Sequence, residues 1–226
     1  VEYYGSVRIQ PLTYQDDEVS GASEVRVVQA QNIKLDYILK EKGLDIHPDK
    51  SGYLVYGSDE YKNKVKGETE KDPLMLGDIE LTQRKSEKYL GDIMDERGLE
   101  ASVEETIRSR LGKVRGSILE LTTISQDFRF EVVGGVLGAL DIWNIAIVPS
   151  LLTNCNVWTE ISEASLKLCE EQQNMLVRSL LKMPGSTPIP ALRALTGLLG
   201  FKRRIWQEKL LLVVAIKKAE GTLAKM

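Results

Sequence analysis

The spacing of apolar residues changes near residue 100, and this change constrains the fold more than any other feature of the chain. Beyond Ser102, apolar side chains recur every three or four residues, as they do on one face of an α-helix: Ile107, Leu111, Val114, Ile118 and Leu121. Ser102 followed by Glu105 is typical of a capping box, which predicts a helix beginning at Ser102.

The rest of the second half also consists of helical stretches separated by breaks. Pro149 and the segment Pro184-Gly185-Ser186-Thr187-Pro188 are the clearest interruptions, because proline cannot continue a helix without losing a hydrogen bond. We expect helices at 127–147, 163–182, 190–199 and 201–218. Residues 101–226 are therefore predicted to form an all-helical bundle.

Residues 1–100 have shorter apolar runs separated by turn residues, which is typical of mixed structure. We expect one helix at 22–40, which Gly43 would end in a left-handed conformation. We also predict short strands, one hairpin and a charged loop: strands at 7–10, 12–14, 54–56 and 89–94, the hairpin at 74–81 and the loop at 59–72. The predicted fold class is α+β, with an antiparallel sheet and one helix in residues 1–100 followed by the helical bundle.

Composition excludes several classes of function. No apolar run approaches the roughly 18 residues that a membrane span needs. Cys155 and Cys169 lack the spacing of a zinc site and are expected to be reduced thiols, and the single His47 leaves little material for a histidine-based centre. The net charge of −3 argues against a general nucleic-acid binder. However, residues 1–100 contain 14 Lys and Arg against 21 Asp and Glu, whereas residues 101–226 contain 16 against 12.

Two adjacent carboxylates follow an aromatic residue in Tyr14-Gln15-Asp16-Asp17. The flanking runs predict that they lie at the tip of a tight β-hairpin with at least one of them accessible to solvent. Carboxylate oxygens are the ligands that Mg²⁺ prefers, and metal-dependent nucleotidyl transfer requires such a pair. Because Asp-Asp also occurs in ordinary solvated turns, the residues alone leave both interpretations open.

The order of motifs resembles the reverse transcriptases of non-LTR (LINE-like) retrotransposons. Four features follow the aspartate pair in the expected order: the helix at 22–40, the segment 43–57 with Lys50, the Tyr89-Leu90-Gly91 element, and the region 182–204 with Arg203-Arg204. Gln15 and the polar run Glu18-Val19-Ser20 depart from the family's pattern. The resemblance covers nearly the whole chain, and it implies a partial polymerase palm at 1–100 and a thumb with the following helical region at 101–226.

The resemblance also implies roles for individual residues. Asp16 and Asp17 would be catalytic ligands of Mg²⁺, and Lys50 would stabilise the leaving pyrophosphate. Contacts to nucleic acid would come from the palm, the element before the thumb and the first thumb helix: Tyr14, Tyr89, Leu90, Gly91, Arg108, Arg110, Lys113 and Arg115. For Lys50 and for the four cations of the helix, a solvated surface position is the alternative interpretation.

A polymerase palm needs a further metal-binding aspartate on an earlier strand, and none can be placed before Tyr14. We therefore expect the chain to be inactive alone and to need the remainder of the polymerase polypeptide. The partners would be an RNA template with a DNA primer and a dNTP, and the location would be intracellular, in cytoplasm and nucleus. Two alternatives stay open: a domesticated or decayed remnant that acts as a helical interaction module, and an unrelated α/β protein with a helical appendage.

Overall fold

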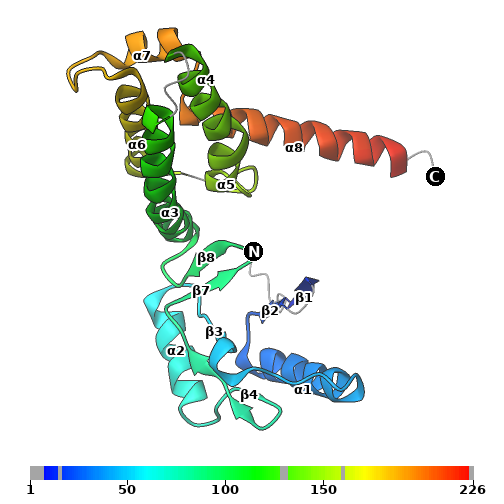
Figure 1. Ribbon diagram of the computed structural model, residues 1–226. Coiled ribbons are helices and arrows are strands. Elements are labelled where there is room, and N and C mark those ends of the chain that lie inside the picture. The colour runs from blue at the N-terminus through cyan, green and yellow to red at the C-terminus, as the bar shows by residue number, and fades with distance from the viewer. Residues whose placement is uncertain (1–7, 15–16, 128–131, 159–160, 224–226) are drawn as a thin grey trace. The chain divides into compact units, whose positions relative to one another are not determined.

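The computed structural model describes the chain except for residues 1–7, 15–16, 128–131, 159–160 and 224–226. The chain divides into two compact units, Val1–Gly98 and Leu99–Met226 (Figure 1). Helices make up 63% of the structure and the sheets are small, which confirms the expected α+β class at this coarse level. None of the described helices is long and apolar enough to cross a membrane.

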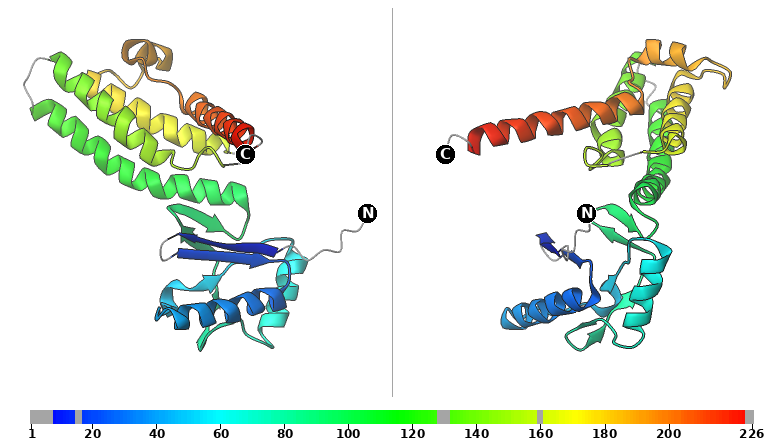
Figure 2. Two further views of the ribbon diagram at one scale, coloured as in Figure 1. Left: turned by 90° about the vertical axis from the view of Figure 1, so that its right-hand side faces the viewer. Right: turned by 180° about the vertical axis from the view of Figure 1, so that it is seen from behind.

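The first unit begins with an antiparallel hairpin of β1 (Arg8–Tyr14) and β2 (Asp17–Ala22). Helix α1 (Val25–Glu41) follows and packs against β2, and the left view of Figure 2 shows the hairpin above the helix. Gly43 has a φ of 65°, so the predicted left-handed stop after this helix is confirmed. The helix starts after Glu24, and no side chain caps its N-terminus.

Short elements complete the core of the first unit. They are the 3₁₀ turn η1 (Pro48–Lys50), β3 (Gly52–Tyr53), α2 (Asp59–Thr69), β4 (Met75–Leu76), β5 (Ile79–Glu80) and β6 (Thr82–Gln83). The β4–β5 hairpin at the predicted position packs on α1 and supplies the buried Leu74 and Leu76. The side chains of Gln29 and Asn32 fix α1 to this hairpin, because both donate to the Met75 carbonyl and the Gln29 carbonyl oxygen accepts from the Met75 amide at 2.8 Å.

Three expectations for the first unit are wrong. The predicted loop at 59–72 is mostly the helix α2, whose N-terminus is capped by the Ser58 side chain. The predicted strand at 54–56 is absent, and strand structure occurs just before it, in β3. In place of one antiparallel sheet with one helix, the described residues form four two-stranded sheets and two helices, and the β3–β6 pair is parallel. Strands of two residues offer too few ladder hydrogen bonds to merge into one sheet.

A third hairpin ends the first unit, where a single strand at 89–94 had been predicted. Its strands are β7 (Ser86–Tyr89) and β8 (Asp92–Asp95), with Tyr89 opposite Asp92. Leu90 and Gly91 between them have φ values of 47° and 87°. Two central residues with positive φ are what the tightest hairpin turns require, and this geometry explains why the chain reverses at that point.

The described residues of the second unit form helices joined by turns and irregular segments, and no strand lies between Ser102 and Leu180 in the part that the structure describes. Its elements are α3 (Leu99–Asp127), α4 (Val132–Ile142), the π-helical turn η2 (Trp143–Ile147), α5 (Val148–Leu151), α6 (Glu163–Leu181), α7 (Ile189–Thr196) and α8 (Phe201–Leu223). The predicted capping box is wrong, because α3 already begins at Leu99 and Ser102 lies inside it. The π-helical turn directly precedes Pro149, whose ring removes one backbone donor from the helix.

The core of the second unit is built around the predicted apolar stripe of α3. Ile107, Trp143 and Phe201 are completely buried there. The buried Gln173 of α6 connects these elements, since its carbonyl oxygen accepts from the Trp143 indole N–H and its amide donates to the Leu199 carbonyl, both at 3.3 Å. Cys155 and Cys169 are buried free thiols, and burial raises their pKa values to about 11 and about 12.

Candidate functional site

The register of the first hairpin fixes the position of the aspartate pair in the chain. Tyr14 is the last residue of β1 and lies opposite Asp17, the first residue of β2. Only Gln15 and Asp16 separate the two strands, and both lie outside the described residues. The side chains of Tyr14 and Asp17 are also not described, so the predicted exposure of the carboxylates stays a prediction.

The residue after the pair adds a third acidic group to the hairpin. Glu18 lies opposite Thr13 and is half-buried, and this burial raises the pKa of its carboxyl group. No cluster of three or more potential ligand side chains occurs among the described residues. A metal site at this hairpin would therefore need carboxylates from outside the described residues.

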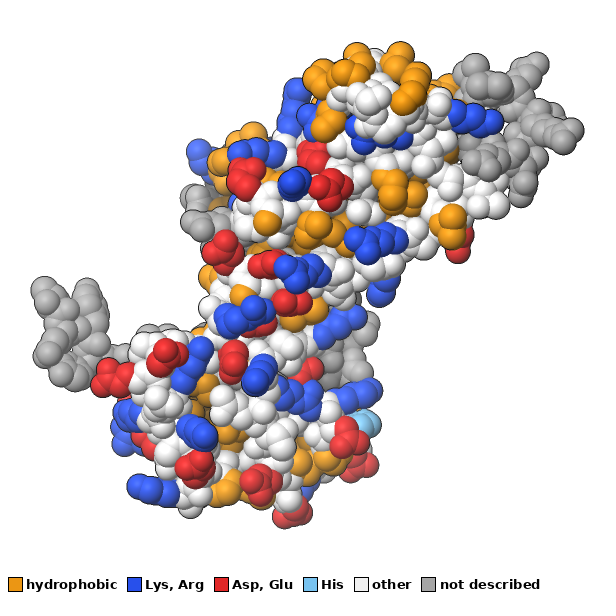
Figure 3. Space-filling model, turned by 90° about the vertical axis from the view of Figure 1, so that its left-hand side faces the viewer, with side chains coloured by type: hydrophobic (Ala, Val, Ile, Leu, Met, Phe, Trp, Pro, Cys, Tyr) orange, Lys and Arg blue, Asp and Glu red, His pale blue; other side chains and the backbone are white. Residues whose placement is uncertain are grey.

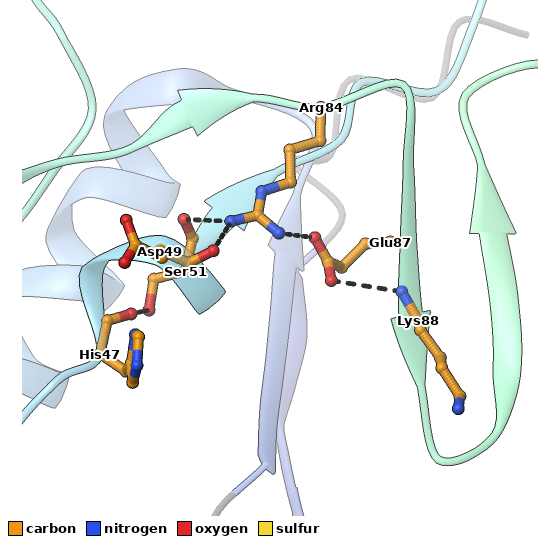
Figure 4. Close-up of polar contacts among 6 residues, drawn as sticks. All are labelled: His47, Asp49, Ser51, Arg84, Glu87 and Lys88. Carbon is orange, nitrogen blue, oxygen red and sulfur yellow. Dashed lines mark hydrogen bonds and ion pairs between the residues drawn. The ribbon is translucent and has the colours of Figure 1, made fainter.

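Lys50 is the last residue of η1 and is exposed to solvent. The loop around it is held by Arg84, whose guanidinium donates to the backbone carbonyls of Asp49 and Ser51 (Figure 4). Arg84 in turn forms an ion pair with Glu87 of β7. No pattern in the sequence reveals the role of this arginine, because its partners are backbone carbonyls more than thirty residues earlier in the chain.

The predicted Tyr89-Leu90-Gly91 element forms the tip of the β7–β8 hairpin. Tyr89 is half-buried, whereas Leu90 is 42% exposed at the turn. The base of the hairpin is fixed by the buried Asp95, which accepts from the Arg97 backbone amide and from two guanidinium nitrogens at 2.8 and 2.9 Å. Hydrogen bonds from Arg97 hold the pKa of the Asp95 carboxyl below its usual range.

The four predicted phosphate contacts on α3 do not share one face of the helix. Arg108 and Arg115 are exposed and seven residues apart, which places them on the same side after two turns. Lys113 is exposed on another side. Arg110 is half-buried instead, and its guanidinium donates to the carbonyls of Leu151 and Thr153 at 3.1 and 2.8 Å.

Arg110 therefore has a structural role at the end of α5. Its guanidinium also lies 5.8 Å from the centre of the Trp158 ring. Arg204 of the predicted Arg203-Arg204 pair is similar, because it donates to the Asn144 side chain and the Leu199 carbonyl, and burial lowers its pKa. Arg108, Lys113, Arg115 and Arg203 remain as exposed cations among these candidates.

Sequence reasoning missed a large apolar surface on α8. Beyond Ile205 this helix exposes six large apolar side chains, each to between 48% and 62%: Trp206, Leu210, Leu211, Val213, Val214 and Ile216. Apolar residues occupy every side of this stretch, whereas a surface helix normally has a polar face. The uninterrupted run from Leu210 to Ile216 is the sequence signal that could have identified it.

Comparisons with protein-family models, with curated proteins and with solved structures found no match for this chain. Functional inference therefore depends on the residues described above and on the order of motifs in the sequence.

Proposed function

We propose that this chain is a fragment of an RNA-directed DNA polymerase of a non-LTR retrotransposon. Residues 1–100 would contribute part of the palm, and residues 101–226 the thumb and the helical region that follows. The observation that carries the proposal is the β1–β2 register, which leaves only two residues between Tyr14 and Asp17. This is the tight hairpin on which a pair of catalytic carboxylates would be presented.

Asp16 and Asp17 would hold Mg²⁺ together with an aspartate from the remainder of the polymerase. When bound, the metal would lower the pKa of the primer hydroxyl and neutralise negative charge on the leaving pyrophosphate. Lys50, exposed at the end of η1, would stabilise the leaving group, and the contacts of Arg84 would keep its loop in position. Tyr14 would offer an aromatic surface to the primer end.

The grip on an RNA template with a DNA primer would come from two places. The exposed turn of β7–β8 would support the primer strand, with Leu90 at its tip. Arg108, Lys113 and Arg115 of α3 would contact backbone phosphates, which is a sequence-independent interaction. Arg110 would support these contacts indirectly, because it orders the end of α5.

The test is primer extension by this chain joined to a LINE-like palm segment that supplies the missing aspartate and the dNTP site. The chain alone should extend no primer, since one hairpin cannot fix two Mg²⁺ ions. The joined protein should show Mg²⁺-dependent extension that Asp16→Ala abolishes and Lys50→Ala slows. Asp72→Ala, which removes an exposed carboxylate after α2, is the matched control and should retain activity. Activity of the isolated chain, or an active Asp16→Ala protein, would show that the proposal is wrong.

The exposed apolar surface of α8 favours a second candidate function, a catalytically inert remnant that acts as a helical interaction module. In that case the aspartate pair would be vestigial. The two functions predict different results in the same experiment. A module would give a joined protein without extension activity, and Leu210→Glu with Val214→Glu would abolish its association with a partner. A polymerase fragment would keep its activity after these two substitutions.

A further inference from the structure

The apolar residues of α8 form one uninterrupted run from Leu210 to Ile216. Successive residues of an α-helix are rotated by about 100°, so a run of this length covers every side of the helix. Figures 1 and 2 show that this part of α8 extends beyond the other helices of the second unit. Its large apolar side chains are 48–62% exposed, except for the half-buried Leu212. On the face of the second unit that Figure 3 draws, by contrast, apolar side chains lie between charged ones.

Three of the exposed apolar side chains form a row on one side of α8. Trp206, Leu210 and Val213 are spaced by four and three residues and are 60%, 60% and 48% exposed. Helices that bind in the groove of a partner protein use anchors with this spacing. The Lys209 ammonium lies 6.0 Å from the centre of the Trp206 ring, so the aromatic anchor has a cation beside it. Helix α8 therefore presents the anchors that an apolar groove receives.

The charge of α8 is predominantly positive. The helix contains six Lys and Arg against two Glu. Lys209 precedes the apolar run, and Lys217 and Lys218 follow it, so cations lie at both of its ends. Lys202, further from the run, pairs with Glu163 of α6 at 2.9 Å. Because interfaces bring patches of opposite charge together, a complementary partner combines an apolar groove with carboxylates at its rim.

Three other occupants fit α8 less well. A lipid surface covers only one side of a helix that lies on it, whereas the run is apolar on every side. A second copy of α8 brings the same excess of positive charge, and like charges across an interface cost free energy. A phosphate backbone would pair with the cations but leave the apolar anchors exposed to water. A groove that encloses the helix satisfies both the anchors and the cations.

We propose that α8 binds in the groove of an acidic partner protein of the calcium-loaded EF-hand class. Calcium opens such helix pairs and exposes a methionine-rich apolar groove, whose side chains adapt to different anchors. Basic helices with an apolar face are typical targets of these proteins. Trp206, Leu210 and Val213 enter the groove, and carboxylates of the partner pair with Lys217 and Lys218. This binding goes beyond the polymerase role and does not depend on it, and it gives the interaction surface of α8 a partner of defined chemistry.

The test is a titration of dye-labelled calmodulin, a calcium sensor of this class, with the complete chain, followed by fluorescence anisotropy. The chain should bind calcium-loaded calmodulin, and removal of calcium with EDTA should abolish binding because the groove closes. Leu210→Ala should weaken binding at least about tenfold, and Trp206→Ala at least about thirtyfold, as expected for truncated anchors. Both side chains are 60% exposed, so these variants should fold like the original chain.

Leu195→Ala is the matched control for Leu210→Ala, because Leu195 is a 63% exposed leucine on α7. This variant should bind calmodulin within about twofold of the original chain. The proposal is overturned if calcium-loaded calmodulin does not bind, if Leu210→Ala and Leu195→Ala bind it equally, or if phosphatidylserine vesicles bind the chain through Leu210 in its place. None of these measurements involves nucleic acid, so their outcome is separate from that of the primer-extension test.

Discussion

At the scale of single residues, Arg84 determines how the loop around Lys50 is held. Its guanidinium contacts two backbone carbonyls on one side and the Glu87 carboxylate on the other. These contacts require space beside Gly52, where a Cβ atom would lie 2.6 Å from the Arg84 Nε and 3.0 Å from the Thr82 carbonyl oxygen. A glycine here is needed because the backbone of the paired strand is close, and a backbone atom cannot swing away as a side chain can.

Gly52→Ala should therefore destabilise the chain by about 1–3 kcal/mol, the usual cost of overpacking. The free energy of unfolding can be measured with urea at neutral pH. Gly67→Ala is the control, because Gly67 lies in α2 with open space around it, and alanine should stabilise the helix there by about 0.5–1 kcal/mol. Equal effects of the two substitutions would mean that Arg84 does not pack against Gly52.

Asp95 gives a prediction about pH. Its pKa is lower in the folded chain than in the unfolded chain because of Arg97, so the folded state gains stability from the ionised carboxylate above the ordinary pKa, about 3.9. This contribution is lost as the pH falls through the folded pKa. Asp95→Asn should lower the unfolding free energy by about 1–3 kcal/mol at pH 7, as expected for hydrogen bonds to a charged group.

The difference between Asp95→Asn and the original chain should narrow steadily in acid. Urea unfolding at a series of pH values between neutral and strongly acidic would measure it. A difference that stays constant over that series would exclude the Asp95 carboxylate as its source.

At the scale of elements, the period of apolar residues predicted the long helices well. The shorter elements depend instead on capping and turn residues. The stripe of α3 from Ile107 to Leu121 is buried as expected. Helix α2 was missed because it has few apolar residues and buries only Val65 and Thr69. Ser58 followed by Asp59 and Glu60 is a cap with acidic residues in the first turn, and this signal could have revealed the helix.

Other features could not be predicted at this scale because they depend on contacts distant in sequence. The parallel β3–β6 pair joins residues thirty positions apart with only two residues in each strand. Arg110 appears in the sequence as one of several cations on α3, and only the fold brings it to the end of α5.

The link between η2, α6 and the start of α8 depends on Gln173, which is 1% exposed. Gln173→Met keeps the approximate shape but leaves the Trp143 indole N–H and the Leu199 carbonyl without this partner. The Leu199 carbonyl still accepts from the Arg204 Nε, so the Trp143 indole N–H is the group left unpaired, and the variant should lose about 1–3 kcal/mol of unfolding free energy.

Urea unfolding followed by tryptophan fluorescence would measure the loss in Gln173→Met. Gln207→Met is the control, since Gln207 is exposed on α8 and its replacement should change stability by less than about 0.5 kcal/mol. If both variants unfold together with the original chain, the hydrogen bonds of Gln173 contribute nothing to the core.

At the scale of the whole molecule, the chain consists of an acidic mixed unit, which ends at Gly98, and a mildly basic helical unit, which begins at Leu99. The change of periodicity at residue 100 predicted this division, because two kinds of element cannot share one repeating pattern. The role of each unit is less visible in the sequence. The proposed nucleic-acid contacts depend on which cations stay exposed after folding, and the fold uses Arg110 and Arg204 internally.

The proposed grip on a primer–template duplex predicts a specific dependence on salt. Each phosphate contact releases about one counterion, so the logarithm of the association constant should fall linearly with the logarithm of salt concentration. Arg108→Gln combined with Arg115→Gln should reduce this slope by about 2, because both side chains are exposed on one face of α3. Fluorescence anisotropy of a labelled RNA–DNA duplex with the complete chain would measure the slope between about 50 and 200 mM salt.

Lys64→Gln combined with Lys66→Gln removes the same charge from α2 and should leave the slope unchanged. Arg110→Gln should lower the stability of the chain without changing the slope. A slope that falls equally in the α2 and α3 double variants would mean that binding follows net charge alone, and the assignment of α3 as a thumb helix would then be wrong.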